Sequence, residues 1–123
     1  QARLDPADVD LVCAHGTSTK ANDRTETLAL HTVFGDHAGS LAVTAPKSMT
    51  GHLIGAAGTL ASLLCAMSIV EGVIPPTINY TTPDPECDLD YVPNTAREQD
   101  VQYAVTNAFG FGGQNCVVAF GRV

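Results

Sequence analysis

Residues 53–70 form an uninterrupted stretch without a single charged side chain, and this stretch constrains the fold of the chain most. Its length would allow a helix to cross a membrane. Glycine, serine and threonine residues dilute its hydrophobicity, however, and no second span or basic flank accompanies it. A helix that is apolar on every side in a water-soluble protein is one that lies in the core. We therefore predict a buried central helix over residues 53–70 and no membrane as a partner.

The composition is that of one ordinary folded domain. The chain has 123 residues, of which 45% are hydrophobic and only 15% charged. The usual charged fraction is about 25%, so the low value indicates that other protein covers much of this chain. A net charge of −7 argues against nucleic acid and anionic membranes as partners. Because the chain opens on Gln1 in the middle of its pattern, we expect residues 1–123 to be part of a longer polypeptide.

Cysteine usage indicates a reducing, cytoplasmic compartment. The four cysteines are widely spaced, with no C-x-x-C pair that would suggest a zinc or thioredoxin-like site. Cys13, Cys65 and Cys116 lie in apolar stretches, which predicts buried, reduced thiols. The acidic residues Asp84, Glu86, Asp88 and Asp90 lack the ligand spacing and turn glycine of a calcium loop. They are expected to form a solvated face, and we predict neither a metal site nor a cofactor.

The hydrophobic pattern predicts an α/β fold with a mixed, mostly parallel sheet. An apolar run ending in His-Gly indicates a first buried strand, and a helix with Asn22 as its cap and Gly35 as its stop follows. A second strand precedes the charge-free helix, and two final strands flank the glycine-rich bend "GFGGQ". Four strands are thus predicted, over residues 9–14, 40–46, 103–109 and 115–121. The last of them is expected to pair antiparallel with its neighbour.

Two histidines follow predicted strands, at the position where α/β sheets usually bind ligands. His15 comes directly after the first strand, and it either acts on a substrate or caps local backbone. His52 follows the second strand and precedes the charge-free helix. The positive end of that helix dipole favours a neutral imidazole, which can donate a hydrogen bond to a developing oxyanion.

Several further residues are candidates for the same site. Lys47 follows an apolar strand and calls for a carboxylate partner, for which Glu26 is the best candidate; a lone surface lysine is the alternative. Thr17 and Thr19 could line a polar channel or satisfy turn backbone. The sequence "FGFGG", which contains Phe109 and Phe111, is not a phosphate loop, and an apolar gate or pocket wall is the more plausible interpretation.

Taken together, "AHGTST…ND..E", "APKSMTGHLIGAAG" and "NAFGFGGQN" resemble the C-terminal half of the β-ketoacyl synthases, which have the thiolase fold. "HGTST" and "SMTGH" favour the discrete enzymes of fatty-acid and type II polyketide synthesis over the modular ones. Lys20, where many relatives have proline, is a departure that concerns the local loop shape. The resemblance implies a decarboxylative Claisen condensation between an acyl thioester and malonyl-carrier protein. It also implies a role for each candidate: His15 and His52 in decarboxylation and enolate binding, Lys47 and Glu26 as a supporting pair, Phe111 with Phe109 as the acyl gate, and Thr17 and Thr19 on the pantetheine arm.

The resemblance further implies a cysteine nucleophile on a tight strand-to-helix turn. None of the four cysteines lies in such a setting, so we expect the nucleophile in an N-terminal half outside this chain. The expected partners are that half, acyl carrier protein and a second subunit, in a homodimer or in a heterodimer with a related chain. The alternative is a non-catalytic subunit of the chain-length-factor type, although both histidines and Lys47 are retained. A thiolase is disfavoured because "FGFGG" stands where thiolases carry a second cysteine in a C-x-G stretch.

Overall fold

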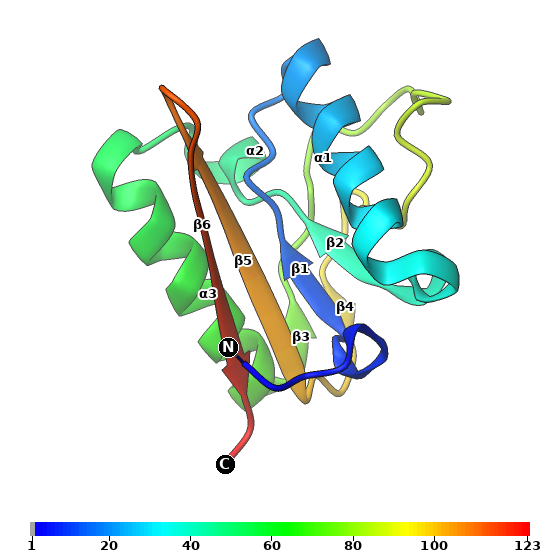
Figure 1. Ribbon diagram of the computed structural model, residues 1–123, viewed down its shortest axis with the longest axis vertical. Helices are drawn as coiled ribbons and strands as arrows, with labels where there is room; N and C mark the ends of the chain where they lie inside the picture. Colours follow the sequence, from blue (N-terminus) through cyan, green and yellow to red (C-terminus); the bar gives the residue numbers. More distant parts are fainter. Residues whose placement is uncertain (1) are drawn as a thin grey trace.

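The computed structural model describes residues 2–123 and contains one mixed sheet of four strands (Figure 1). The strand order is β2-β1-β5-β6. β1 pairs in parallel with both β2 and β5, whereas β5 and β6 form an antiparallel hairpin. This confirms the predicted mostly parallel sheet with one antiparallel terminal strand. The strands span β1 (Leu11–Cys13), β2 (Ala42–Thr44), β5 (Tyr103–Gly110) and β6 (Gln114–Gly121).

Helices α1 (Lys20–Phe34) and α3 (Ala57–Glu71) cover opposite faces of this sheet (Figure 1). Side chains along a strand point alternately to the two faces, and β1 divides its residues accordingly. Leu11 and Cys13 belong to the core under α3, while Val12 belongs to the core under α1. Three consecutive buried residues therefore serve two separate hydrophobic clusters, as a strand enclosed on both sides requires.

Short elements connect these layers. They are the 3₁₀ turns η1 (Pro6–Asp8), η2 (Gly35–Ser40) and η3 (Ile54–Ala56), the helix α2 (Lys47–Thr50) and the strands β3 (Val73–Ile74) and β4 (Arg97–Glu98). β3 and β4 pair antiparallel as a second, two-stranded sheet, which the sequence did not predict. Next to it, Arg97 donates two hydrogen bonds to the Asp90 carboxylate. The ion pair anchors the acidic segment whose residues were expected to be merely solvated.

The start of α1 differs from the prediction. Thr19, rather than Asn22, has the extended backbone of an N-cap, and its hydroxyl accepts a hydrogen bond from the Asn22 N–H at 3.3 Å. Asparagine is on average the better helix cap of the two, so cap preference alone pointed to Asn22 instead of Thr19. Gly35 ends the helix as predicted. Asn22 lies inside the first turn, and its amide is free to contact the site described below.

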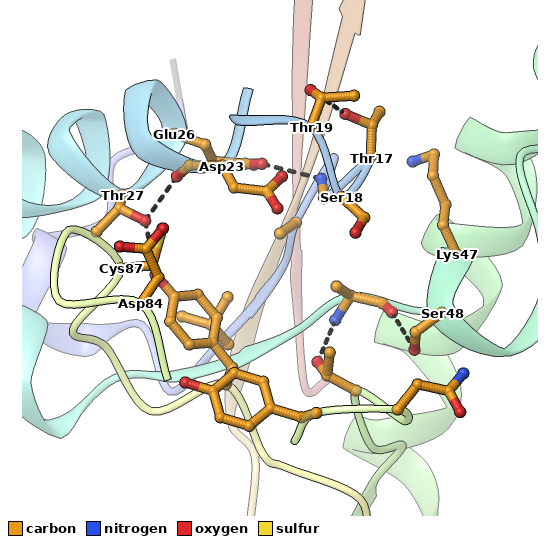
Figure 2. A pocket seen from close by; sticks show the side chains of 18 of the residues that line it. Thr17, Ser18, Thr19, Asp23, Glu26, Thr27, Lys47, Ser48, Asp84 and Cys87 are labelled. Carbon is orange, nitrogen blue, oxygen red and sulfur yellow. Dashed lines mark hydrogen bonds between the residues drawn. The ribbon is translucent and has the colours of Figure 1, made fainter. Parts of the chain in front are cut away.

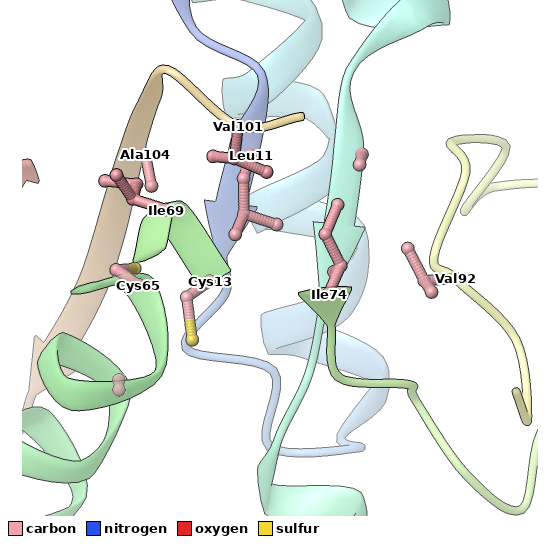
Figure 3. Packing of buried hydrophobic residues seen from close by; sticks show 10 residues of the cluster. Leu11, Cys13, Cys65, Ile69, Ile74, Val92, Val101 and Ala104 are labelled. Carbon is pink, nitrogen blue, oxygen red and sulfur yellow. The ribbon is translucent and has the colours of Figure 1, made fainter. Parts of the chain in front are cut away.

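The prediction that residues 53–70 are buried on all sides is wrong within this chain. The helix proper begins at Ala57, and only 22% of the residues in Ile54–Glu71 are buried, although the stretch is long and apolar enough to cross a membrane. Ala61, Cys65 and Ile69 pack on the sheet in the cluster of Figure 3. The opposite face is exposed and still apolar, and it includes Leu63, Met67 and Val70.

The carboxylate of Asp10 holds the start of β5 against β1. Its Oδ2 accepts hydrogen bonds from the backbone N–H groups of Gln102 at 2.7 Å and Tyr103 at 3.0 Å. Asp10→Ala would leave two half-buried donors without an acceptor, so we expect it to lower the free energy of unfolding by about 1–3 kcal/mol. Denaturant titration measures this loss. Asp36→Ala is the control, because Asp36 is exposed and its side chain forms no hydrogen bond within residues 2–123; a loss of equal size there would contradict the assignment.

Candidate active site

The loop that follows β1 turns sharply at Gly16, directly after His15. Gly16 has a φ of +43°, and a Cβ at this position would lie 2.7 Å from the Cβ of Ala45. Only glycine combines a left-handed backbone with so close an approach. The glycine of the His-Gly pair therefore brings the loop against the segment that follows β2.

Glu26 fixes this loop from α1. Its side chain is 4% exposed, and its two carboxylate oxygens accept hydrogen bonds from the backbone N–H groups of His15 and Gly16, each at 2.9 Å. The amides of Asn22 and Asn107 donate to the same carboxylate at 3.2 and 3.0 Å. A buried carboxylate is costly unless hydrogen bonds replace its water, and these four donors do so.

The predicted ion pair between Lys47 and Glu26 is wrong. Within residues 2–123, the Lys47 ammonium makes no salt bridge; it donates its hydrogen bond to the backbone carbonyl of His15. Partial burial lowers the pKa of Lys47, and the nearby Cys13 and Glu26 oppose this shift. The two residues still act on one target, because Glu26 binds the N–H of His15 and Lys47 binds its C=O.

The two predicted histidines lie together. The ring centroids of His15 and His52 are 5.8 Å apart, with the ring planes nearly perpendicular at 83°. The ring centroid of Phe109, on β5, lies 5.4 Å from that of His15. His52 Nδ1 accepts a hydrogen bond from the Ile54 N–H at 3.1 Å, which leaves the ring proton on Nε2. Nε2 can therefore donate one hydrogen bond.

The pKa of His15 is lowered, first because the ring is partly buried and then because the positive charge of Lys47 lies nearby; Glu26 opposes this shift. Both leading causes favour the neutral imidazole, which can donate one hydrogen bond. The unfolded chain therefore binds more protons than the folded one between the two pKa values of His15. The contribution of His15 to stability accordingly increases as the pH rises through that window.

A cavity of about 470 Å³ lies beside the histidines, between α1, the loop after β1 and the segment of residues 77–82. Thr17, Glu26 and Lys47 surround it (Figure 2), but neither histidine lines it. The hydroxyls of Thr17 and Thr19 lie 3.0 Å apart. The paired histidine rings, rather than the size of the cavity, identify the chemical centre, because a neutral imidazole N–H can donate a hydrogen bond to a developing negative charge.

The remaining residues, Phe111 and the cysteines, do not contact the histidine pair in the way that Phe109 does. Phe111 lies in the turn between β5 and β6 and is fully exposed in this chain, whereas Phe109 contacts His15. Cys13 and Cys65 are buried as predicted, but Cys116 is exposed. The neighbouring Cys65 thiol and burial both raise the pKa of Cys13, so Cys13 remains a thiol.

Asn22 and Asn107 are residues of the site that the sequence did not assign to it; Asn22 was expected only to cap a helix, and Asn107 was given no role. Both occur within the quoted motifs, and both contact Glu26. Of the two, Asn107 could more readily have been found from the sequence, because it is a polar side chain within an otherwise mainly apolar strand. A residue of that kind calls for a hydrogen-bond partner.

Comparison with known proteins agrees with this geometry. Residues 1–81 match the family model "Beta-ketoacyl synthase, C-terminal domain", and the chain belongs to the β-ketoacyl synthase family. It is 54% identical over 122 residues to nodulation protein E of Rhizobium sp. (strain N33), covering 99% of this chain and 30% of that protein. It is 52% identical over 117 residues to 3-oxoacyl-[acyl-carrier-protein] synthase 2 of Synechocystis sp., covering 95% of this chain and 28% of that protein.

Solved structures show the same thiolase-like fold. The chain superposes with a TM-score of 0.96 on AntDE:AntF, a type II polyketide acyl-carrier protein in complex with its ketosynthase, at 38% identity and covering 99% of this chain and 30% of that one. The ishigamide ketosynthase/chain length factor gives a TM-score of 0.93 at 44% identity, covering 98% and 29%. The chain thus spans less than a third of the length of these relatives.

Gly16 offers a direct test of the loop geometry. Gly16→Ala would force a Cβ into Ala45 at 2.7 Å on a left-handed backbone, and we expect the free energy of unfolding to fall by about 1–3 kcal/mol. Denaturant titration provides the measurement. Gly39→Ala is the matched control, because a Cβ there meets nothing within 4 Å; equal losses in the two variants would contradict the close approach.

Lys47 offers a test of the electrostatics of the site. Lys47→Met removes the positive charge that helps to lower the pKa of His15, so we expect that pKa to rise, while burial still keeps it below its ordinary value. Titration of the His15 ring protons by NMR measures the change. Lys20→Met removes an exposed charge at the start of α1 and should leave the His15 pKa unchanged. An unaltered His15 pKa in Lys47→Met would refute the assignment.

Proposed function

We propose that this chain is the C-terminal part of a β-ketoacyl-[acyl-carrier-protein] synthase that condenses an acyl thioester with malonyl-carrier protein. The observation that carries the proposal is the pair of His15 and His52, whose perpendicular rings lie 5.8 Å apart beside Phe109. Membership of the β-ketoacyl synthase family and the similarity to 3-oxoacyl-[acyl-carrier-protein] synthase 2 support the reaction class.

In the proposed reaction the histidines act as hydrogen-bond donors. The carboxylate of the malonyl group leaves as carbon dioxide, and the electron pair of the broken C–C bond forms an enolate on the thioester. His52 Nε2–H and the neutral His15 ring would donate to the enolate oxygen and so stabilise its charge. The enolate carbon then attacks the carbonyl of the enzyme-bound acyl thioester, and the cysteine leaves as its thiolate.

The acyl-accepting cysteine is proposed to lie outside residues 2–123. A nucleophilic cysteine needs a lowered pKa, which a helix N-terminus or a nearby positive charge provides. Cys13 has the opposite property, because its pKa is raised. The free thiols of Cys13, Cys65, Cys87 and Cys116 are compatible with the cytoplasm, which we propose as the compartment.

The rest of the longer polypeptide is the proposed cover for exposed apolar side chains of α3 and β6. Leu63 and Val70 on α3 are 53% and 75% exposed, and Val117 on β6 is 60% exposed; extended apolar surfaces of this kind mark sites where other protein packs. The chain also spans only 30% of the relatives that it matches. We propose acyl carrier protein and a second subunit, identical or related, as further partners; Thr17 and Thr19 would contact the pantetheine arm, and Phe111 with Phe109 would gate the acyl pocket.

Substitution of each histidine in the full-length protein tests the proposal. One oxyanion donor is worth about 10²–10³ in kcat, so His15→Ala and His52→Ala should each lower product formation from acyl- and malonyl-carrier protein by about that factor. His31→Ala is the control, since His31 lies on α1 and bonds to Asp88 instead. Product formation unaffected by both site substitutions would contradict the roles given to the histidines.

Mass spectrometry on the same protein separates the catalytic proposal from its alternative. An acyl adduct on a cysteine upstream of Gln1 is the expected result. A stoichiometric adduct on one of the four cysteines of this chain would overturn the placement of the nucleophile. The complete absence of an adduct, together with stimulation of a related subunit, would instead support a partner of the chain-length-factor type.

A further inference from the structure

The hydrogen bonds of the Glu26 carboxylate follow a regular division. Oε1 accepts from the His15 N–H and the Asn107 amide, and Oε2 accepts from the Gly16 N–H and the Asn22 amide. Each oxygen therefore receives one backbone donor and one side-chain donor. A carboxylate has about four lone-pair sites, so this set fills the capacity of a side chain that is 4% exposed.

The two asparagines differ in what they connect. Asn22 lies on α1, four residues before Glu26, and links two positions of the same helix. Asn107 lies on β5, 81 residues away from Glu26 in sequence. Its hydrogen bond therefore ties the helix and the histidine loop to the sheet.

Asn107 and Phe109 share one face of β5, because side chains two residues apart on a strand point the same way. Phe109 lies 5.4 Å from the His15 ring, and Asn107 reaches the His15 backbone through Glu26 Oε1 at 3.0 Å. Strand β5 thus contacts the ring of His15 through Phe109, and it holds the backbone of His15 through Asn107 and Glu26. A shift of β5 relative to α1 would move both together.

We propose that Asn107 is a positioning residue that aims Glu26, and through it His15, in the condensation proposed above. The amide matters because it donates a hydrogen bond without carrying a charge. An aspartate of the same shape would place a second carboxylate about 3 Å from the first. The repulsion between two carboxylates this close raises the pKa of one of them, so the pair binds a proton at a higher pH than a single carboxylate does. The shared proton would then restore the missing hydrogen bond.

The test compares Asn107→Asp and Asn107→Ala in the full-length protein, with malonyl-carrier protein decarboxylation and condensation as readouts. Asn107→Ala should lower kcat by about tenfold or more at every pH, since a buried hydrogen bond to a charged group is lost, with KM nearly unchanged. Asn107→Asp should be impaired at neutral pH and regain activity relative to the unsubstituted protein as the pH falls. A purely structural role would not give the aspartate variant this pH profile.

Two controls make the outcome decisive. Asn115→Asp puts the same new charge on the neighbouring strand, opposite Phe109 and in an exposed position, and should keep the ordinary pH profile. Glu26→Gln combined with Asn107→Asp leaves one carboxylate facing one amide, so the acid-dependent recovery should disappear. The proposal is overturned if Asn107→Asp has the unsubstituted profile, or if the recovery persists in the double variant.

Thermal unfolding of the same proteins gives a readout that needs no activity. The raised pKa of the carboxylate pair means that folded Asn107→Asp binds more protons than its unfolded chain, so its stability must fall as the pH rises. Its deficit in Tm should narrow on acidification. If the unsubstituted protein does not condense, the proposed function fails while this measurement still tests the contact; a Tm deficit independent of pH would refute the contact itself.

Discussion

The site depends on one buried carboxylate. Glu26 is 4% exposed and has no cationic partner within hydrogen-bonding distance among the residues that the structure describes. Its charge is balanced instead by N–H donors from the histidine loop, from its own helix and from β5. Because removing any donor would leave part of a buried charge unsolvated, the carboxylate couples three elements. Lys47 adds the complementary hydrogen bond to the His15 carbonyl, so the backbone of His15 is held on both sides of its Cα.

The architecture explains why this coupling occurs at the end of β1. Leu11 and Cys13 face one core and Val12 faces the other, so β1 is held on both faces and its C-terminal end can move little. His15 leaves the strand from this rigid point, and the parallel pairing of β1 with β2 and β5 brings the residues after β2 and the end of β5 to the same edge. Parallel strands place their ligand-binding loops together in this way.

The sequence predicted the sheet, the order of the elements and the association of His15 with His52, because hydrophobic runs and strand-end positions are local signals. The sequence did not predict which groups donate hydrogen bonds to Glu26 or which group accepts one from Lys47. Glu26 and Lys47 carry opposite charges and were paired on that ground, yet each binds the backbone of His15, a target that charge patterns cannot indicate. Asn107 was overlooked because its partner lies 81 residues away. β3 and β4 were missed because two-residue strands leave almost no periodic signal.

The predicted central helix is only partly covered within this chain. The charge-free stretch was expected to lie in the core of the assembled protein, but only one face of α3 finds cover among residues 2–123. Leu63 and Val70 are uncovered on the outer face of α3, and Val117 is exposed on the terminal strand β6, on the face of the sheet opposite α3. At about 25 cal/mol per Å² of apolar surface, burying such a surface would release substantial free energy. The low charge content and the exposed apolar side chains of α3 and β6 both support the proposal that further protein packs against these elements.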